Sequence, residues 1–462
     1  MGRRIALIAV GAILLRLIYQ FAMIDAGGSF HNGSDSEKYI NIAEAIVATG
    51  EFAYIDTRVT PTSLIPATDR MPLYPYFLAG MMELFGDDAL PAAAVLQTVM
   101  DGLTVILLAL AAAAIDRRYA VPTAIFAAVI PNFLVHAAYI LTETLFLMFF
   151  AAAIAALLWA LRDRRTVMLL ACAGVMLGLT LLTRPVMMFF PLFLFPALAY
   201  ALPAAKRVSV GRGLALAALP VVIMVAFAVP RIIDNHDRFG HAVLTTQSGN
   251  HLLKWVYPCL NTPWSCASHG TDWDANKPLV DARLAELTPE QRANPAEINA
   301  VYQSVAKEKI AELGIVQIAI GMTVGAIKNT IQTGFYETVT QFRQAPNFLS
   351  AMPGSGIGEK LANFYTTNKG DVFMLAWAVA QAALLVSRLV QAVGLGTGIA
   401  QSALRPYTVM LLMTIAYFLA VNGPVGNPKY RVPAEPGFLI LLSMGLYTII
   451  DVLRRRRQER AQ

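Results

Sequence analysis

The feature that most constrains this chain is a succession of long apolar runs separated by short charged segments. A helix of roughly 17 to 25 apolar residues is long enough to cross the hydrocarbon core of a bilayer. About ten runs of this kind occur, and they are 5–24, 90–115, 119–137, 140–160, 167–183, 185–203, 213–232, 371–393, 406–422 and 436–453. Because the chain is 57% hydrophobic and only 14% charged, it is poorly suited to a water-soluble fold. The pattern predicts an all-α polytopic membrane protein with about ten transmembrane helices.

The basic residues indicate which way the chain is inserted. With all of these runs spanning, the basic clusters fall on one side: Arg3-Arg4, Arg117-Arg118, Arg162 to Arg165, Lys206 to Arg212, Arg388, Arg405 and Arg454 to Arg457. Because cytoplasmic loops carry an excess of Lys and Arg, both termini are expected in the cytoplasm. The same pattern explains the net charge of +6, so nucleic-acid binding is not expected.

This topology divides the chain into three parts. Residues 1–232 form an N-terminal transmembrane module, whose first outer loop (25–89) carries the candidate catalytic site. Residues 233–370 form an outer, periplasmic segment with interfacial helices, and residues 371–462 form the C-terminal transmembrane helices. Short loops and a compact chain favour the bacterial inner membrane.

The outer segment has two further features. The stretch 314–335 is amphipathic, so it either lies in the membrane interface or spans, in which case the even number of spans is lost. Cys259 and Cys266 lie close together in the sequence, and outside the cytoplasm such a pair is expected to form a local disulfide.

The first outer loop is expected to contain two helices that lie on the membrane. In the stretch HNGSDSEKYINIAEAIVATG, Ser34 can cap a helix whose third residue is Glu37, and Gly50 can end it. The apolar residues of this helix form one stripe, which is typical of a helix on the bilayer surface. A second helix, Leu73 to Phe85, is too short and too polar at its ends to span.

These two helices would present Asp35 and Arg70 at the membrane surface. Asp35 lies in a first turn, where backbone N–H groups favour an ionised carboxylate, so it is a candidate general base. Arg70 precedes Pro72 and Pro75 in a stiff segment before a helix, which suits a phosphate. The alternatives are that Asp35 only stabilises the helix start and that Arg70 only anchors the chain. Glu37 is better explained by the capping box than by catalysis.

Charged residues at the outer ends of the apolar runs form a second group of candidates. They are Glu143, Arg184, Arg231 and the Lys429-Tyr430-Arg431 motif. A charge is costly in hydrocarbon, so each is expected to face a partner or a watery cavity. Any one of them could be an interface anchor, but an acid and several bases on one rim indicate a site. Arg16, within the first run, faces either the bundle interior or another helix.

The sequence contains no recognised metal-binding or nucleotide-binding motif. The six histidines show no zinc spacing such as HExxH. His251, in TTQSGNHLLKW, is a candidate site or metal residue, although a lone loop histidine is more often neither. No P-loop and no GxGxxG motif precedes a soluble helix, so no nucleotide site is expected. No cofactor is required, and the metal requirement is unknown: a divalent metal is compatible with the chemistry, but nothing in the sequence demands one.

Several short motifs, in their order along nearly the whole chain, resemble those of one enzyme family. They are SDSEKY, RMPLYPYF, the Thr-Glu pair of the fourth run, LTRP after the fifth, PRIIDNHDRFG with QSGNHLL after the seventh, and KYRVP before the last. This order resembles the polyprenyl-phosphate-dependent type C glycosyltransferases, the family of the protein O-mannosyltransferases and of the aminoarabinose transferase that modifies lipid A.

The resemblance implies roles for individual residues. Asp35 would be the catalytic base, Glu143 a second acid of the catalytic site, and Arg70 a contact of the donor phosphate. Arg184 and the Lys429-Tyr430-Arg431 motif would also bind that phosphate. Arg231 is a weaker match, because related sequences often carry Arg-Asn where this chain has Asp234-Asn235. The outer segment also lacks a long globular extension, so the analogy with enzymes that act on folded proteins is weaker.

The resemblance further implies transfer of a sugar from a polyprenyl-phosphate donor to an acceptor on the outer face, with inversion. Location supports this, because nucleotide sugars are cytoplasmic and an outer site needs a donor delivered by a membrane lipid. The acceptor remains open among a glycolipid, a glycan and a protein. One alternative is a transporter or flippase of lipid-linked sugars, which predicts internal repeats that are not seen. Another is a glycan ligase that uses a lipid diphosphate.

Overall fold

A computed structural model describes residues 1–31, 33–56, 63–264, 266, 271–335, 352–354 and 356–461. The longer helices are α1 (Gly2–Asp25), α2 (Gly33–Thr49), α3 (Leu73–Phe85), α4 (Ala89–Ile115), α5 (Ala120–Val129), α7 (Glu143–Ala160), α8 (Thr166–Thr183), α9 (Pro191–Lys206), α10 (Val210–Ala226), α11 (Val229–Phe239), α14 (Thr271–Ala285), α16 (Pro295–Glu312), α17 (Gly314–Ile331), α19 (Ile357–Asn368), α20 (Val372–Ala400), α21 (Arg405–Asn422) and α23 (Glu435–Ala461).

Shorter elements connect these helices. The short helices are η1 (Gly86–Asp88), η2 (Arg117–Tyr119), α6 (Pro131–His136), η3 (Pro185–Phe189), α12 (Ser248–His251), the π-helical η4 (Leu252–Val256), α13 (Tyr257–Asn261), α15 (Pro289–Ala293), α22 (Pro428–Arg431) and η6 (Val432–Ala434). The strands β1 (Ala53–Ile55) and β2 (Leu64–Pro66) pair antiparallel, with Tyr54 opposite Ile65. The all-α fold class is thereby confirmed apart from this small hairpin.

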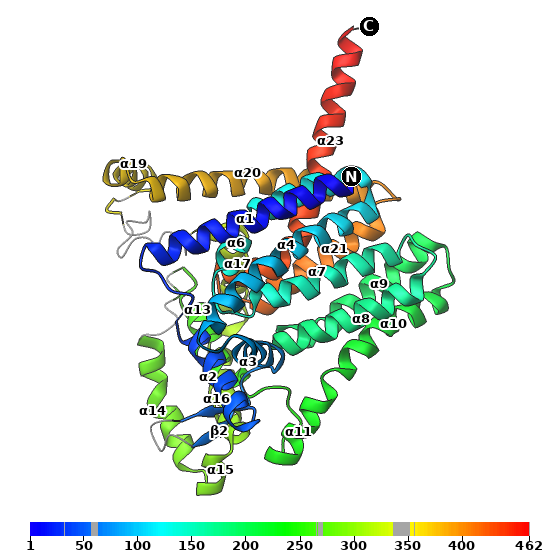
Figure 1. The fold of residues 1–462 in the computed structure, drawn as a ribbon. Coiled ribbons are helices and arrows are strands. Elements are labelled where there is room, and N and C mark those ends of the chain that lie inside the picture. Colours follow the sequence, from blue (N-terminus) through cyan, green and yellow to red (C-terminus); the bar gives the residue numbers. More distant parts are fainter. Residues whose placement is uncertain are drawn as a thin grey trace.

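The long helices form a bundle, and several of the connecting elements gather at one of its ends. Figure 1 places α2, α3, β2 and α14 to α16 at the lower end of the molecule, opposite the C-terminal end of α23. We call the end that carries α2, α3 and α14 to α16 the loop end of the bundle. Elements from the first loop and from the segment 271–312, far apart in the sequence, therefore lie at the same end.

Seven helical segments of the described residues are long and apolar enough to cross a membrane, or eight if the bent pair α10 and α11 counts as one. They are Gly2–Asp25, Leu73–Ile115, Glu143–Ala160, Thr166–Thr183, Gly314–Ile331, Val372–Ala400 and Pro428–Arg460. Helix breaks explain part of the difference from ten runs. The run 119–137 is divided into α5 and α6 at Pro131, and 185–203 into η3 and α9. The number of spans therefore stays a prediction.

Lipid contact is the physical reason for the exposed apolar faces of this bundle. On α20 the side chains of Val372, Val379 and Leu389 are 69 to 74% exposed. On α1 the exposed side chains of Leu7, Ile18 and others alternate with buried ones that pack on α4 and α5. A protein in water rarely exposes such continuous apolar surface, whereas a bilayer accommodates it. The multi-pass membrane class expected from the sequence is confirmed.

The first loop differs in detail from the expected pair of helices. Helix α2 begins at Gly33, so Ser34 lies within its first turn rather than before it, and the expected capping box is wrong in register. The helix ends at Gly50, whose φ of +78° favours glycine, as predicted. Helix α3 has the predicted bounds, but it continues through η1 into α4 and so belongs to one long helical segment.

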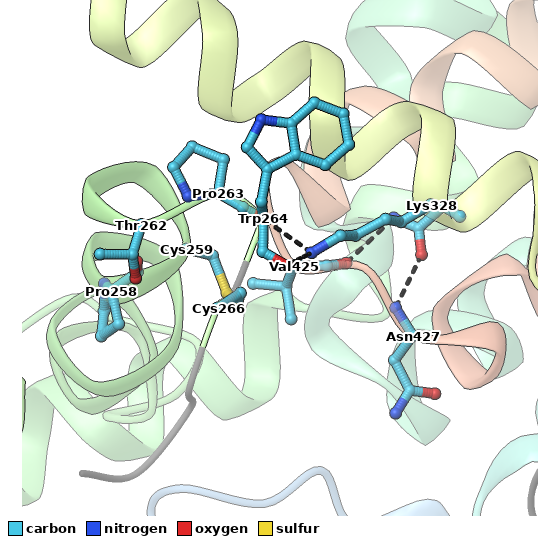
Figure 2. Close-up of a disulfide and its surroundings, with 10 residues drawn as sticks. Pro258, Cys259, Thr262, Pro263, Trp264, Cys266, Lys328, Val425 and Asn427 are labelled. Carbon is cyan, nitrogen blue, oxygen red and sulfur yellow. Dashed lines mark hydrogen bonds between the residues drawn. A yellow bond between two sulfur atoms is a disulfide. The ribbon is translucent and has the colours of Figure 1, made fainter. Parts of the chain in front are cut away.

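Helices α14 to α16, with α12 and η4 packed against them, form a helical layer at the loop end (Figure 1). Leu253, Val280, Val305 and Ala306 give this layer a small core of its own. The charged pattern near residue 300 forms α16, whose first turn is capped by Asn294 through its bond to the Ala296 N–H (2.9 Å). Cys259 and Cys266 form the expected disulfide at the end of α13 (Figure 2). The layer is thus held together by its own contacts as well as by packing on the bundle.

Arg16 has a partner that the sequence did not indicate. Its fully buried guanidinium pairs with Asp101 of α4, and it donates to the carbonyls of Ala128 (2.6 Å) and Ala127 (3.1 Å). These carbonyls lie at the end of α5, where Pro131 prevents the helix from continuing and leaves them without intrahelical partners. Arg16 therefore faces the bundle interior and joins α1, α4 and α5.

Candidate active site

Asp35 lies at the centre of a cluster of ion pairs at the loop end. It occupies the first turn of α2, where the helix dipole favours a carboxylate. Arg70 Nη2 donates to its Oδ1 (3.0 Å), and Lys429 Nζ donates to its Oδ2 (3.3 Å). Both carboxylate oxygens are therefore oriented by cations that come from opposite ends of the chain. Because the Asp35 side chain is still 46% exposed, a substrate can reach it.

Glu143 forms the buried floor of the same cluster. It is the first residue of α7 and is only 1% exposed. Its Oε1 accepts from Arg184 Nη1 (2.5 Å) and lies 3.6 Å from Lys429 Nζ. Arg184 follows the last residue of α8, and its guanidinium stacks on Phe146. Lys429 is thus shared between an exposed carboxylate, Asp35, and a buried one, Glu143.

Arg70 connects the cluster to a rim of polar residues that the sequence motifs did not single out. Its Nη1 lies 3.3 Å from Asp69 Oδ2, and its guanidinium lies over the ring of Tyr39 at 5.5 Å. Asp69 also accepts from Tyr54 OH (2.7 Å) and lies 3.7 Å from Lys38 Nζ. The β1–β2 hairpin brings Tyr54 to this rim. Three-residue strands give no clear periodic signal, so only the adjacency of Asp69 to Arg70 was available in the sequence.

The surroundings of Asp35 determine its proton affinity. Burial raises the pKa of its carboxyl, but the charges of Lys429 and Arg70 more than compensate and hold it below the ordinary value of 3.8. Burial raises the pKa of Tyr54, and the neighbouring Asp69 raises it further, so this phenol stays protonated. At neutral pH the site therefore presents an ionised Asp35 between two cations.

Several other predicted residues lie outside this cluster. Arg431 is buried with Glu435, whose Oε1 accepts from its Nε (2.5 Å). Tyr430, by contrast, adjoins the cluster: its half-buried side chain interacts electrostatically with Lys429, Arg184, Asp35 and Glu143, while its carbonyl accepts from Asn422 Nδ2 (2.7 Å). Glu37 is exposed on α2. His251 lies on α12 where that helix packs against α16, and burial lowers its pKa.

Arg231 supports the loop that carries Arg70 rather than joining the ion pairs of Asp35. Its Nη2 donates to Ala67 O (2.9 Å), its Nη1 pairs with Asp234 (3.4 Å), and its guanidinium lies 5.0 Å from the Phe52 ring centroid. Ala67 follows β2 and precedes Arg70 by three residues. Arg231 thus fixes the entry to the Arg70 segment from α11.

An apolar pocket lies beside the cluster. It has a volume of about 560 Å³ and is lined by Pro72, Leu182, Ala226, Phe227, Pro230, Arg231 and Asp234. Pro72 and Leu182 are each two residues from a cation of the cluster, Arg70 and Arg184. The site therefore combines fixed charges with an adjacent apolar surface. In the described part of the chain no group of three or more His, Cys, Asp or Glu residues is placed to hold a metal ion.

The bundle, its loop end and this charge cluster together define a membrane protein with the type C glycosyltransferase fold. The oligosaccharyltransferase of Archaeoglobus fulgidus tethered with an acceptor peptide is similar at a TM-score of 0.53 and 13% identity, covering 98% of this chain and 50% of that chain. The same archaeal enzyme, AglB, in complex with an inhibitory peptide and a dolichol-phosphate gives 0.52 and 15%, covering 100% and 51%. The chain thus spans about half the length of these structures.

The sequence comparison gives the family that this chain resembles. Residues 69–233 match the family model described as dolichyl-phosphate-mannose-protein mannosyltransferase, which is just over a third of the chain. This match confirms the resemblance that the motifs indicate. ArnT from Cupriavidus metallidurans bound to undecaprenyl phosphate is also similar, at 14% identity over 94% of this chain and 77% of that chain, but its TM-score of 0.42 carries no weight. No curated protein sequence matches the chain.

The matched segment holds only part of the site. Arg70, Glu143 and Arg184 lie within residues 69–233, whereas Asp35 precedes that segment and Lys429 follows it. The fold brings all five into one chain of ion pairs. The structure therefore adds two charged residues, Asp35 and Lys429, to the three that lie in the matched segment.

Proposed function

We propose that the protein is a glycosyltransferase that moves a sugar from a polyprenyl-phosphate donor to an acceptor at the outer face of the membrane. The observation that carries this proposal is the partly exposed Asp35 carboxylate held between Arg70 and Lys429 (3.0 and 3.3 Å). A carboxylate can accept the proton of an attacking hydroxyl. Cations beside it can stabilise the negative charge that a departing phosphate develops. The cluster supplies both groups within one site.

The balance of charges suits an anionic leaving group. Arg70, Arg184, Lys429 and Lys38 supply four positive charges, and Asp35, Glu143 and Asp69 supply three negative ones. A lipid phosphate entering the site would compete with Asp35 for Arg70 and Lys429. Release from these cations raises the proton affinity of the carboxylate. Donor binding would therefore turn a weak resting base into a stronger one at the moment when a base is needed.

The proposed step is a single displacement with inversion. The acceptor oxygen or nitrogen forms a bond to the anomeric carbon, and the bond from that carbon to the phosphate oxygen breaks. Polyprenyl phosphate leaves with the bonding electrons, and the acceptor proton passes to Asp35 Oδ. Arg70 and Lys429 bind the leaving phosphate, and Glu143 holds Arg184 and Lys429 in place. No proton has to be given to the phosphate, because cations stabilise it.

The neighbouring pocket supports a donor carried by a lipid. Its wall of Leu182, Ala226 and Phe227 is apolar, and its lining residues Pro72 and Leu182 are each two residues from Arg70 and Arg184 in the sequence. A polyprenyl chain lying there would place its phosphate among the cations. The family description names dolichyl phosphate mannose, and the archaeal neighbour was solved with a dolichol-phosphate. Both descriptions agree with a donor of this chemical class.

The location of the site supports the same donor. The arginines at the C-terminal end of α23 lie opposite the loop end (Figure 1). Arg388, which was expected among the cytoplasmic basic residues, instead donates to Thr330 O at the end of α17 and does not follow this pattern. By the positive-inside rule the loop end then faces away from the cytoplasm, which for a bacterial inner membrane is the periplasm. Nucleotide sugars are absent there, so the sugar must arrive on a lipid.

The test is donor consumption by the purified protein in nanodiscs. A panel of sugars on polyprenyl monophosphate and on polyprenyl diphosphate is offered with a glycolipid, a glycan or a peptide as acceptor. Released polyprenyl phosphate and inverted product are measured. The proposal expects turnover with a monophosphate donor, and loss of turnover in Arg70→Ala. Turnover with diphosphate donors alone would assign a glycan ligase instead, and consumption of none would favour a transporter.

A further inference from the structure

The C-terminal end of α17 has carbonyl groups that side chains from two other helical segments satisfy. Arg431 Nη1 donates to Asn329 O (2.8 Å) and Gln332 O (2.5 Å), while Arg388 Nε of α20 donates to Thr330 O (2.9 Å). The last carbonyls of a helix have no intrahelical partners, and leaving them unsatisfied away from water is costly. Two arginines therefore bind this helix end, where the negative end of the helix dipole stabilises their positive charges.

Asn329, in the last turn of α17, is bonded to the loop that precedes Lys429. It is fully buried, its Nδ2 donates to Val425 O (3.0 Å), and its Oδ1 accepts from Asn427 N–H (3.0 Å). Asn427 in turn caps α22 by accepting the Lys429 N–H at its Oδ1 (2.8 Å). Figure 2 shows Val425 and Asn427 beside Lys328 of α17. Hydrogen bonds thus run from Asn329 to the backbone of Lys429.

Close packing holds the same loop against α17. A side chain at Gly325 would collide with the backbone of Gly423 and Pro424, and one at Gly426 would collide with Lys328. Lys328 extends past the loop to the carbonyls of Pro263 (2.6 Å) and Trp264 (3.1 Å), which lie within the disulfide loop. The loop therefore has little freedom to shift along α17.

We propose that Asn329 and Arg431 are positioning residues that fix Lys429 beside Asp35 and Glu143. Arg431 anchors the end of α22 to α17 and to Glu435 (2.5 Å), and Asn329 anchors its beginning. Lys429 lies between these anchors, and its ammonium reaches the two carboxylates at 3.3 and 3.6 Å. Arg431 thus serves the site through Lys429 and not through a contact with phosphate. The kinetic part of this proposal rests on the proposed function, but the geometric part does not.

Chemical cross-linking tests the geometric part without substrate. A zero-length carbodiimide joins an amine to a carboxylate that it contacts, so the wild type should give a Lys429–Asp35 link detectable by mass spectrometry. Asn329→Ala should lower its yield severalfold. The Lys38–Asp69 pair (3.7 Å) provides an internal reference that does not involve α17. Asn363→Ala, which removes a half-buried asparagine bonded to Pro353 O, is the matched control.

Two cross-linking results would overturn the proposal. If Asn329→Ala gives the same Lys429–Asp35 yield as the wild type, Asn329 does not position Lys429. If the wild type gives no such link while Lys38–Asp69 forms, the placement of Lys429 is itself wrong. Both results are readable whether or not the protein transfers a sugar.

Kinetics test the functional part. A displacement of about 1 Å at a catalytic group costs on the order of 10²-fold, so kcat of Asn329→Ala should fall by up to that factor. The acid limb of its pH profile should move upward, because Asp35 loses a neighbouring cation. Asn329→Asp, which retains the acceptor for Asn427, should recover part of the loss. A wild-type pH profile in Asn329→Ala would overturn the proposal, whereas an inactive wild type would overturn the proposed function and leave the cross-linking result standing.

Discussion

At the scale of single residues, the protonation of Asp35 depends on a balance between burial and two cations. Burial raises the pKa of the Asp35 carboxyl, and Lys429 is the strongest of the groups that lower it. The base form is the ionised one, so kcat/KM, which reports the free enzyme, should fall only when the pH drops through the lowered pKa. In the wild type this acid limb is therefore expected below the ordinary aspartate value of 3.8.

Replacing Lys429 should move that limb. In Lys429→Met, burial still raises the pKa of Asp35. Of the cations that pair with Asp35 in the described structure, only Arg70 is left to lower that pKa. The pKa of Asp35 rises, and the acid limb of kcat/KM is expected at higher pH than in the wild type. Lys277→Met, at an exposed pair with Asp281, is the control and should leave the profile unchanged. Coincident profiles for wild type and Lys429→Met would show that Lys429 does not set this pKa.

The sequence motifs indicated most of the charge cluster but not its limits. Asp35, Arg70, Glu143, Arg184 and Lys429 meet as the motifs suggested. Arg431 does not join them, and helix geometry gives the reason: residues two positions apart in α22 point to different sides of the helix. A linear motif cannot show this until the local helix is known. Asp69 and Tyr54 were missed because their contacts depend on the β1–β2 hairpin.

At the scale of helices, the buried Arg16–Asp101 pair should be important for stability. Asp101→Asn leaves the Arg16 charge buried beside carbonyls alone, and breaking such a pair costs about 3 to 5 kcal/mol. Thermal unfolding in detergent should therefore show a clearly lower midpoint. The double variant Arg16→Met with Asp101→Leu should recover much of the loss, because it leaves no unpaired charge. Equal stability of Asp101→Asn and the wild type would contradict a structural role for the pair.

Helix existence was predictable from the sequence, whereas breaks and continuations were not. The bounds of α3 follow from its apolar pattern and the preceding proline, and Gly50 ends α2 as expected. The join of α3 to α4 was missed because Gly86, Asp87 and Asp88 are typical of a turn. The break between α5 and α6 lies at Pro131, inside a run that composition alone presents as continuous.

At the scale of the whole molecule, the placement of α17 decides the topology. The helix is long and apolar enough to cross a membrane. However, Gln317 donates to Leu260 O (2.7 Å) and Lys328 donates to Pro263 O (2.6 Å), so the segment 260–264 follows α17 over most of its length. This segment lies between Cys259 and Cys266, whose disulfide is expected outside the cytoplasm. We therefore predict that both ends of α17 lie on the outer side.

Cysteine labelling of intact cells tests this topology. In a Cys172→Ser background, which keeps the Cys259–Cys266 disulfide, single cysteines replace Ile315 and Ile331 near the two ends of α17. A membrane-impermeant maleimide should reach both from outside. Arg460→Cys, at the end of α23, should react only after the membrane is opened. If Ile315→Cys is labelled from outside but Ile331→Cys is labelled only from the cytoplasm, α17 spans the membrane.

The most direct test of the account as a whole is sugar transfer by Asp35→Asn under single-turnover conditions. The asparagine keeps the size of the side chain and removes its ability to accept a proton, and a general base contributes about 10² to 10⁴-fold. We predict a loss of that size with donor binding retained, while Asp87→Asn, an exposed aspartate of η1, transfers at the wild-type rate. If Asp35→Asn transfers the sugar as fast as the wild type, Asp35 is not the base, and the central claim about this site is wrong.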